Sequence, residues 1–193
     1  MYQHVVVKDN VLWIDGIHMH RSGEAATPQQ HAKKMVDQVN LRQGYRVLDI
    51  CTGLGYTALA AAKQGATVTT IEQSSQVLTL LAQHSPSVLQ NKNIEIIEAD
   101  ALDAVKQFDD ATFNAIIHDP PRFSMAGQLY SQAFYAELYR ILKPGAKMFH
   151  YTGKPGIHSG KNMLKGIKNR LTQAGFKNIT WVESALGFTC TKP

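Results

Sequence analysis

RVLDICTGLGYT, residues 46–57, reads as a short apolar strand, a tight glycine turn and the start of a helix. Gly53 and Gly55 have no Cβ atom, so the turn can take positive φ angles and let a ligand approach the main chain. The helix that follows presents free N–H groups and a partial positive charge at its start. The stretch therefore predicts a cradle for a nucleotide or cofactor. A phosphate-binding loop fits poorly, because Ala58 replaces the third glycine of G-x-G-x-x-G and no G-x-x-x-x-G-K-[ST] occurs.

Strands and helices alternate along most of the chain. β-Branched and apolar runs predict strands at 67–71, 94–98, 113–117 and 147–151, with closing strands at 179–183 and 188–190. Helical patterns lie between them, at 77–83, 102–108, 131–142 and 161–174, and Thr27-Pro28 opens an earlier helix that should run to about Asn40. This alternation predicts an α/β, Rossmann-like, doubly wound and mostly parallel sheet.

The chain is expected to form a single domain over residues 1–193. Short β-like runs around the turn pair Asp15-Gly16 predict a small N-terminal β extension over 1–23, and the Rossmann-like core should occupy 27–193. A hydrophobic content of 44% suits a buried core, and no window predicts a membrane span or a signal peptide. The two cysteines, Cys51 and Cys190, form no metal-ligand pair, and a reduced, cytoplasmic setting is expected.

Acidic residues follow successive predicted strands, where ligands of such sheets bind. Glu72 lies 17 residues beyond Gly55, a spacing that suits a carboxylate holding a ribose diol. Asp100 could accept a hydrogen bond from an adenine amine, and Asp119 follows the next strand. Singly, Glu72 could be a solvated acid and Asp100 a helix cap. Together they favour a cofactor site.

Five segments between about residues 30 and 185 resemble the motifs of class I S-adenosylmethionine-dependent methyltransferases: VLDICTGLGYTA, TTIEQS, IIEADALD, FNAIIHDPP and ILKPGAKMFHY. More closely, the run from IIHDPPRF to ILKPG resembles an archaeal-type group of methyltransferases marked by DPPRF. The resemblance implies a seven-stranded sheet and S-adenosyl-L-methionine as the cofactor.

The resemblance also assigns roles by position. Asp49, Gly53 and Gly55 would shape the pocket for the methionine half of the cofactor, with backbone contacts from Thr52 and Leu54. The residues that would hold the adenosine half are Glu72 at the ribose, Gln73 beside the adenine, Asp100 at its amine and Ala101 against its ring.

The acceptor would lie against Asp119, Pro120 and Pro121. Asp119 and Pro120 match the [DN]-P-P-[YF] motif of amino-methyltransferases, but Arg122 stands at the aromatic position and Phe123 follows one residue later. Arg122 could stack on a ring, bind an anion or pair with a nearby acid. His118 or His150 could act as a general base. No metal site is expected, because the His-x-His pair His18 and His20 has no supporting carboxylate pattern.

Three functions remain open. The first is methyl transfer to nitrogen on an RNA base or a small molecule. The formal charge of +5 favours RNA, as do basic residues in the last third of the chain: Lys143, Lys147, Lys154, Lys161, Lys165, Lys168, Arg170 and Lys177. The second is spermidine synthase-like aminopropyl transfer to a polyamine, and the third is a non-catalytic cofactor-binding module. The N-terminal extension could cover the pocket or pair two copies as a homodimer.

Overall fold

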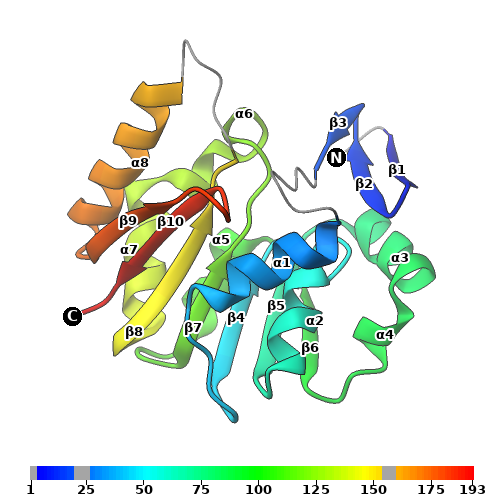
Figure 1. The fold of residues 1–193 in the computed structure, drawn as a ribbon, viewed down its shortest axis with the longest axis horizontal. Helices are drawn as coiled ribbons and strands as arrows, with labels where there is room; N and C mark the ends of the chain where they lie inside the picture. Colours follow the sequence, from blue (N-terminus) through cyan, green and yellow to red (C-terminus); the bar gives the residue numbers. More distant parts are fainter. Residues whose placement is uncertain (1–3, 20–26, 154–159) are drawn as a thin grey trace.

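A computed structural model describes residues 4–19, 27–153 and 160–193, and its centre is a seven-stranded sheet (Figure 1). The strand order is β6-β5-β4-β7-β8-β10-β9, and β10 runs antiparallel to both of its neighbours. The strands are β4 (Arg46–Ile50), β5 (Thr67–Glu72), β6 (Ile94–Glu98), β7 (Phe113–His118), β8 (Leu142–Tyr151), β9 (Lys177–Val182) and β10 (Gly187–Thr191). The expected Rossmann-like, mostly parallel sheet is therefore confirmed.

Helices cover both faces of this sheet (Figure 1). On one face lie α1 (Pro28–Asp37) and α2 (Tyr56–Lys63), whose buried residues pack with Val47 of β4. Leu48 of β4 points to the other face, because side chains alternate along a strand. That face is covered by α5 (Ala101–Ala104), α7 (Gln132–Ile141) and α8 (Gly160–Gln173).

The N-terminal extension forms a separate antiparallel sheet of β1 (Val5–Lys8), β2 (Val11–Ile14) and β3 (Ile17–His18). Asp15 and Gly16 both have positive φ angles, 48° and 76°, as the predicted hairpin turn requires. Residues 20–23 of the expected extension lie outside the described residues. In Figure 1 this sheet stands at the same end of the central sheet as the short helix α6 (Phe123–Ala126).

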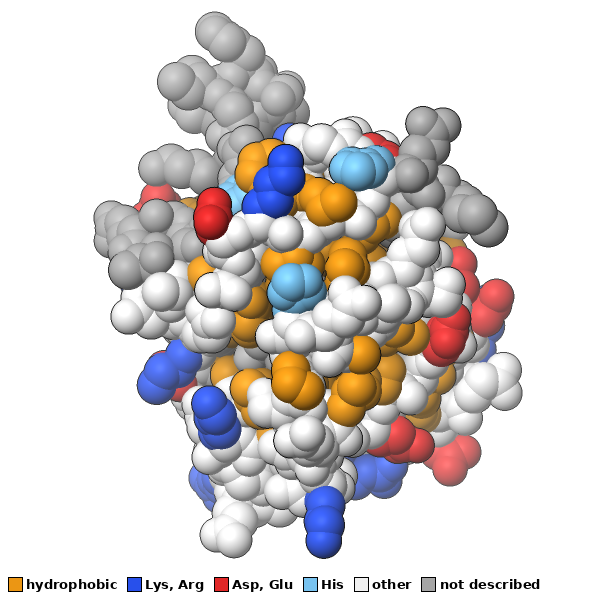
Figure 2. Space-filling view, turned by 90° about the vertical axis from the view of Figure 1, so that its right-hand side faces the viewer, with side chains coloured by type: hydrophobic (Ala, Val, Ile, Leu, Met, Phe, Trp, Pro, Cys, Tyr) orange, Lys and Arg blue, Asp and Glu red, His pale blue; other side chains and the backbone are white. Residues whose placement is uncertain are grey.

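Figure 2 shows the side of the molecule that carries β1, α3 (Ser75–His84) and α4 (Pro86–Leu89). Hydrophobic side chains spread over the middle of this face, and acidic side chains gather along one margin. Lys and Arg are scattered, so the part of the face drawn in colour presents no continuous basic patch.

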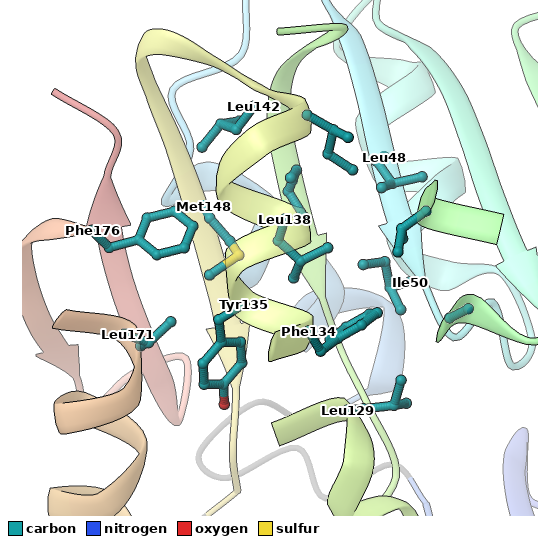
Figure 3. Packing of buried hydrophobic residues seen from close by; sticks show 14 of the residues in the cluster. Leu48, Ile50, Leu129, Phe134, Tyr135, Leu138, Leu142, Met148, Leu171 and Phe176 are labelled. Atoms are coloured by element: carbon teal, nitrogen blue, oxygen red, sulfur yellow. The ribbon is translucent and has the colours of Figure 1, made fainter. Parts of the chain in front are cut away.

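The larger core lies between the sheet and α7 (Figure 3). Phe134, Tyr135 and Leu138 of α7 point toward the strands, and Leu138 is fully buried. Burying a side chain of this size stabilises the fold by about 1.5–3 kcal/mol. Dense packing of this kind holds the strand ends in place.

Several predicted boundaries were wrong. α1 ends at Asp37 rather than near Asn40, and the helix expected at 102–108 is divided into α5 and a 3₁₀ turn, η1 (Val105–Gln107). Lys143-Pro144-Gly145 lies inside β8, because Leu142 is already extended and buried after the last turn of α7. Neither α4 nor α6 was expected, since four-residue helices show no periodicity.

Candidate cofactor and acceptor site

A cavity of about 700 Å³ opens at the carboxyl ends of the parallel strands. This volume is in the usual range for small-molecule sites. Its lining includes the loops after β4, β5, β6 and β7, the inner side of α1, residues 123–129, and residues of the N-terminal sheet. The residues expected at strand ends are therefore brought together, and other segments close over them.

The glycine loop after β4 forms one wall. Cys51, Gly53 and Gly55 all have positive φ angles, and a Cβ atom on Gly55 would lie 2.7 Å from a methyl group of Val88. Only glycine fits there without displacing α4. Thr52 and Gly53 line the cavity, whereas Leu54 and Gly55 lie behind them. Leu54 is fully buried, where it packs with the N-terminal sheet.

Glu72 and Asp100 are held by backbone N–H groups. The Glu72 carboxylate accepts hydrogen bonds from the N–H groups of Gly53 and Ser74, both at 3.1 Å. Burial raises the pKa of Glu72, and these hydrogen bonds oppose that rise. Asp100 caps α5 by accepting from the Leu102 N–H at 2.8 Å, so the helix-cap interpretation is correct. Both acids line the cavity together with Gln73 and Ala101.

Asp49 lies beneath the cavity rather than in its lining. Its Oδ2 accepts from the Thr70 hydroxyl at 2.7 Å, and Thr70 in turn contacts the Thr52 hydroxyl at 2.7 Å. Burial raises the pKa of Asp49 to about 7. Its Oδ1 is buried without a hydrogen-bond partner among the described residues. A buried carboxyl of this kind is stabilised in its charged form by a cation nearby, so it suits a cofactor that carries positive charge.

Asp119 and Pro120 lie at the end of β7 and line the cavity. The Asp119 N–H donates to the Ile50 carbonyl at 3.2 Å, which joins the ends of β7 and β4. Burial, together with the charge of Asp49, raises the pKa of Asp119 to about 8. The Pro121 carbonyl accepts from the Tyr130 hydroxyl at 2.8 Å, while the Pro120 carbonyl accepts no hydrogen bond from the described part of the chain. Asp119 and Pro120 thus present acceptor atoms to a ligand.

Arg122 and Phe123 lie in different places. Arg122 is exposed and contributes to an outer cleft with Trp13, Gly16, Ile17 and His18, not to the main cavity. Phe123 lines the main cavity and keeps 45% of its surface exposed. The extended conformation of Arg122, which precedes the first turn of α6, separates the two side chains. Arg122 is therefore not among the residues that line the cavity with Asp119.

His118 and His150, expected as candidate bases, lie in the interior behind the cavity wall. Both are fully buried, and their rings stack with centroids 4.4 Å apart. His118 Nε2 contacts the Leu129 carbonyl at 2.9 Å, and His150 Nε2 contacts the Tyr135 hydroxyl at 2.9 Å. Burial lowers the pKa of His118 to about 4. Neither histidine lines the cavity, and both support the segment that follows β7.

Sequence reasoning missed several lining residues. Leu12, Ile14 and Met19 contribute from the N-terminal sheet, and His31 and Met35 contribute from α1. His31 is buried, and its Nε2 contacts the Ala185 carbonyl at 3.2 Å. The amphipathic pattern of α1 signals that these positions are buried, but not that they face a cavity. Among the described residues, no group of three His, Cys, Asp or Glu side chains could hold a metal ion.

The fold and the strand-end cavity define a Rossmann-like domain that can hold an adenosyl cofactor. A family model described as a methyltransferase domain matches residues 47–145. The chain belongs to this family, and with it to the class I S-adenosylmethionine-dependent methyltransferases, whose cofactor is S-adenosylmethionine. Thr52, Gly53, Glu72, Gln73, Asp100 and Ala101 are the cavity-lining residues that would hold it.

The chain is also similar to curated proteins and to solved structures. Protein MJ1233 of Methanocaldococcus jannaschii is 47% identical over 93% of this chain and 63% of its own length. MJ1649 of the same organism, named provisionally as a ribosomal RNA large subunit methyltransferase, is 30% identical over 65% of this chain and 34% of its own length. A spermidine synthase in complex with the transition-state analogue AdoDATO has a TM-score of 0.75 at 19% identity, over 95% of this chain and 66% of that chain. At 19% identity, the likeness to spermidine synthase shows a shared fold and no more.

The chain spans less than two thirds of the length of these two curated relatives. Within the described residues, no helix combines the length and the apolar character needed to cross a membrane.

Proposed function

We propose that this chain transfers a methyl group from S-adenosylmethionine to a nitrogen acceptor held against Asp119 and Pro120. The observation that carries the proposal is one cavity lined both by the cofactor loops and by Asp119-Pro120, and the Pro120 carbonyl accepts no hydrogen bond from the described residues. The 47% identity to the M. jannaschii protein supports placing the chain in the archaeal-type DPPRF group.

The bound cofactor supplies a methyl group that its sulfonium already activates. The residues must position the acceptor so that the nitrogen lone pair points at the methyl carbon, because displacement is in line. The Asp119 carboxylate and the Pro120 carbonyl can each accept an N–H of the acceptor, which orients that lone pair. Transfer would form the N–C bond as the C–S bond breaks, with S-adenosylhomocysteine as the leaving group, and the Asp119 carboxylate would take the proton released from nitrogen.

The acceptor is either an RNA base or a small molecule. The name of MJ1649 supports RNA, as do the +5 charge and the exposed side chains of Lys165 and Lys168 on α8. Lys154 and the side chain of Lys161 lie outside the described residues. The cavity volume of about 700 Å³ supports a small molecule. Association of two copies through the N-terminal sheet stays a prediction, which sedimentation would test.

Aminopropyl transfer is the alternative that the likeness to spermidine synthase raises. A polyamine needs several acids, but only Glu72, Asp100 and Asp119 line the cavity in the described residues, and we assign the first two to the cofactor. Calorimetry with S-adenosylmethionine, its decarboxylated form and S-adenosylhomocysteine distinguishes methyl transfer from aminopropyl transfer. Tighter binding of the decarboxylated form would favour aminopropyl transfer, and no binding of any of the three would refute cofactor use.

Asp119→Ala tests the catalytic assignment. We expect methyl transfer to be lost while affinity for S-adenosylhomocysteine stays within a few-fold of wild type, because Asp119 is assigned to the acceptor. The assay uses labelled methyl groups with total RNA and a small-metabolite extract in parallel, which identifies the acceptor class. Full activity in the variant would remove Asp119 from the mechanism. If the wild-type protein binds the cofactor but methylates neither mixture, the result would favour the non-catalytic binding module.

A further inference from the structure

The outer cleft is a second candidate binding site, beside the N-terminal sheet. It has a volume of about 430 Å³ and is lined by Trp13, Gly16, Ile17, His18 and Arg122. Trp13 of β2 and His18 of β3 are register partners, and their ring centroids lie 4.9 Å apart. Arg122 contributes from the turn that begins α6. The outer cleft therefore joins the N-terminal sheet to the segment that follows β7.

Three hydrogen-bond donors of the outer cleft have no partner among the described residues. The Arg122 guanidinium is exposed and forms neither an ion pair nor a hydrogen bond with them. The Trp13 indole N–H makes no hydrogen bond with them and is not one of their buried unpartnered atoms, so a ligand can reach it. The Gly16 N–H, in the hairpin turn, makes no hydrogen bond with them either. Donors left open in one cleft suit a ligand that supplies several acceptor oxygens.

The outer cleft and the main cavity differ in charge. No Asp or Glu of the described ranges lines the outer cleft, so the charge of Arg122 has no neutralising carboxylate there. The main cavity is lined by Glu72, Asp100 and Asp119, and by no Lys or Arg of the described ranges. An anionic group would therefore be repelled in the main cavity and attracted in the outer cleft.

The two sites are close enough for one acceptor molecule to reach both. Arg122 follows Asp119 by three residues, so their Cα atoms lie within about 11 Å of each other. Phe123 lines the main cavity while its neighbour Arg122 lines the outer cleft, so the turn that begins α6 forms the boundary between them. The N-terminal sheet and α6 stand at the same end of the central sheet (Figure 1). An acceptor whose nitrogen lies at Asp119 can extend past this turn to Arg122.

We propose that the outer cleft is a phosphate subsite for the acceptor. Arg122, the Trp13 indole N–H and the Gly16 N–H would donate to the oxygen atoms of a phosphate ester, while the nitrogen to be methylated lies at Asp119. A guanidinium matches the geometry of phosphate oxygens and keeps its charge at any working pH. This proposal rests on the methyl-transfer function proposed above. A phosphodiester of RNA and a free phosphomonoester share this chemistry, and the assays below distinguish them.

The first test is a titration with inorganic phosphate, followed by heteronuclear NMR on protein saturated with S-adenosylhomocysteine. The chain has 2 tryptophans, and Trp181 is the internal reference because its indole N–H donates to Glu183 at 2.7 Å. We expect phosphate to shift the Trp13 indole signal and the Gly16 amide signal but not the Trp181 indole signal, relative to chloride at the same ionic strength. No shift of Trp13, or equal shifts of both indoles, would overturn the proposal.

Variants assign the binding to the cleft. Arg122→Gln should weaken phosphate binding roughly 3- to 10-fold, because water screens part of a charge-assisted hydrogen bond at an exposed side chain. Trp13→Phe keeps the ring, removes the N–H and should also weaken binding, as followed at the Gly16 amide. Arg42→Gln is the matched control, since Arg42 is exposed and lines neither site. Equal affinity in Arg122→Gln and wild type would refute the subsite, as would equal losses in Arg122→Gln and Arg42→Gln.

Three uridine probes identify the source of the phosphate. Uridine carries none, uridine 5′-monophosphate carries a phosphomonoester, and hexauridylate carries phosphodiesters. We expect uridine to bind most weakly, and the advantage of the phosphorylated probes to be lost in Arg122→Gln. Tighter binding of hexauridylate would identify RNA, and tighter binding of the monophosphate would identify a small acceptor. Uridine binding as tightly as both phosphorylated probes would contradict the proposal.

Failure of this inference can be told from failure of the proposed function. In the labelled-methyl assay, Arg122→Gln should slow transfer at limiting acceptor and leave it near the wild-type rate at high acceptor, because the contact holds the acceptor before and during transfer alike. A wild-type rate at limiting acceptor would refute the phosphate subsite and leave methyl transfer standing. If the wild-type protein binds no S-adenosylhomocysteine, the proposed function itself is refuted, whereas the phosphate titration still reports on the outer cleft.

Discussion

Asp119 combines two properties at the scale of a single residue. It lines the cavity, and its carboxyl lies close enough to Asp49 for the charge of one to raise the pKa of the other. Burial raises the pKa of Asp49 to about 7, and burial together with the charge of Asp49 raises the pKa of Asp119 to about 8. A positive sulfonium bound beside them would favour their charged forms.

The preference for S-adenosylmethionine over S-adenosylhomocysteine should therefore depend on pH. Below about pH 7 the neutral carboxyls offer a cation little attraction, and above about pH 8 both are charged. We expect the affinity ratio to rise severalfold between pH 6 and pH 9, as calorimetry with both compounds would measure. Asp119→Asn should flatten the profile, and an unchanged profile in that variant would show that Asp119 does not face the sulfonium.

Arg122 and Phe123 show how the position of a single residue in a turn decides which side chain faces the cavity. Motif spacing placed Arg122 at the acceptor position, but the chain turns at Arg122 to begin α6. Arg122 consequently faces the outer cleft and Phe123 the cavity. Neighbouring residues in a turn have no fixed periodicity, so spacing alone could not decide which one enters the site.

At the scale of elements, the segment between β7 and α7 is held by several side-chain hydrogen bonds. Tyr130 binds the Pro121 carbonyl, His118 contacts the Leu129 carbonyl, and Arg170 Nε donates to the Tyr130 carbonyl at 2.7 Å. These contacts come from β7, from the segment itself and from α8. They position Asp119 and Pro120 although none of the three side chains lines the cavity.

Tyr130→Phe removes the hydroxyl that holds Pro121. Sinefungin carries an amine where the cofactor carries its methyl group, so its affinity relative to S-adenosylhomocysteine reports on Asp119 and Pro120. We expect that ratio to fall about 2- to 10-fold, the usual value of one hydrogen bond. Tyr139→Phe is the matched control, because Tyr139 packs on Phe176 and its hydroxyl makes no hydrogen bond with the described residues. Equal effects of both variants would argue against positioning by Tyr130.

The N-terminal sheet is the second element that shapes the site. Leu12 and Ile14 pack on Leu54 and Val77, and the Tyr56 hydroxyl donates to the Asn10 carbonyl at 2.8 Å. This small cluster is separate from the two cores of the central sheet. The sheet can therefore close the cavity without being part of the main folding core.

Leu12→Ala should act on ligand binding more than on folding. The change removes apolar contacts above the glycine loop, and we expect weaker S-adenosylhomocysteine binding in calorimetry with little change in the free energy of unfolding. Leu138→Ala, in the core beneath α7, should do the reverse and lower that free energy by about 2–5 kcal/mol. If Leu12→Ala bound the ligand like wild type, the N-terminal sheet would have no part in the site.

At the scale of the whole molecule, the cavity joins segments that lie far apart in the chain. Residues 12–19, 28–35, 51–57, 99–102 and 119–129 all contribute to it. The opposite edge of the molecule, with α8 and β9, does not. A ligand in the cavity should stabilise the contributing segments together, because local stability is not uniform across a fold.

Hydrogen exchange with and without S-adenosylhomocysteine measures this distribution. We expect slower exchange in the N-terminal sheet, α1, the glycine loop and the segment after β7. Exchange in β9 should change little and serves as the internal reference. Protection confined to the glycine loop would show that the cofactor does not span the cavity, and uniform protection would indicate global stabilisation alone.

The order of strands and helices, the glycine loop and the acids at Glu72, Asp100 and Asp119 could all be predicted from the sequence. Each depends on local properties: apolar periodicity, the conformational freedom of glycine, and the rule that parallel strands end at one edge. Tertiary structure alone decided that the N-terminal sheet and α1 close the cavity, that Phe123 enters it and that His118 is buried behind it. Those outcomes depend on packing between segments distant in sequence, and no local pattern encodes which side chain of a turn or strand end will face the shared space.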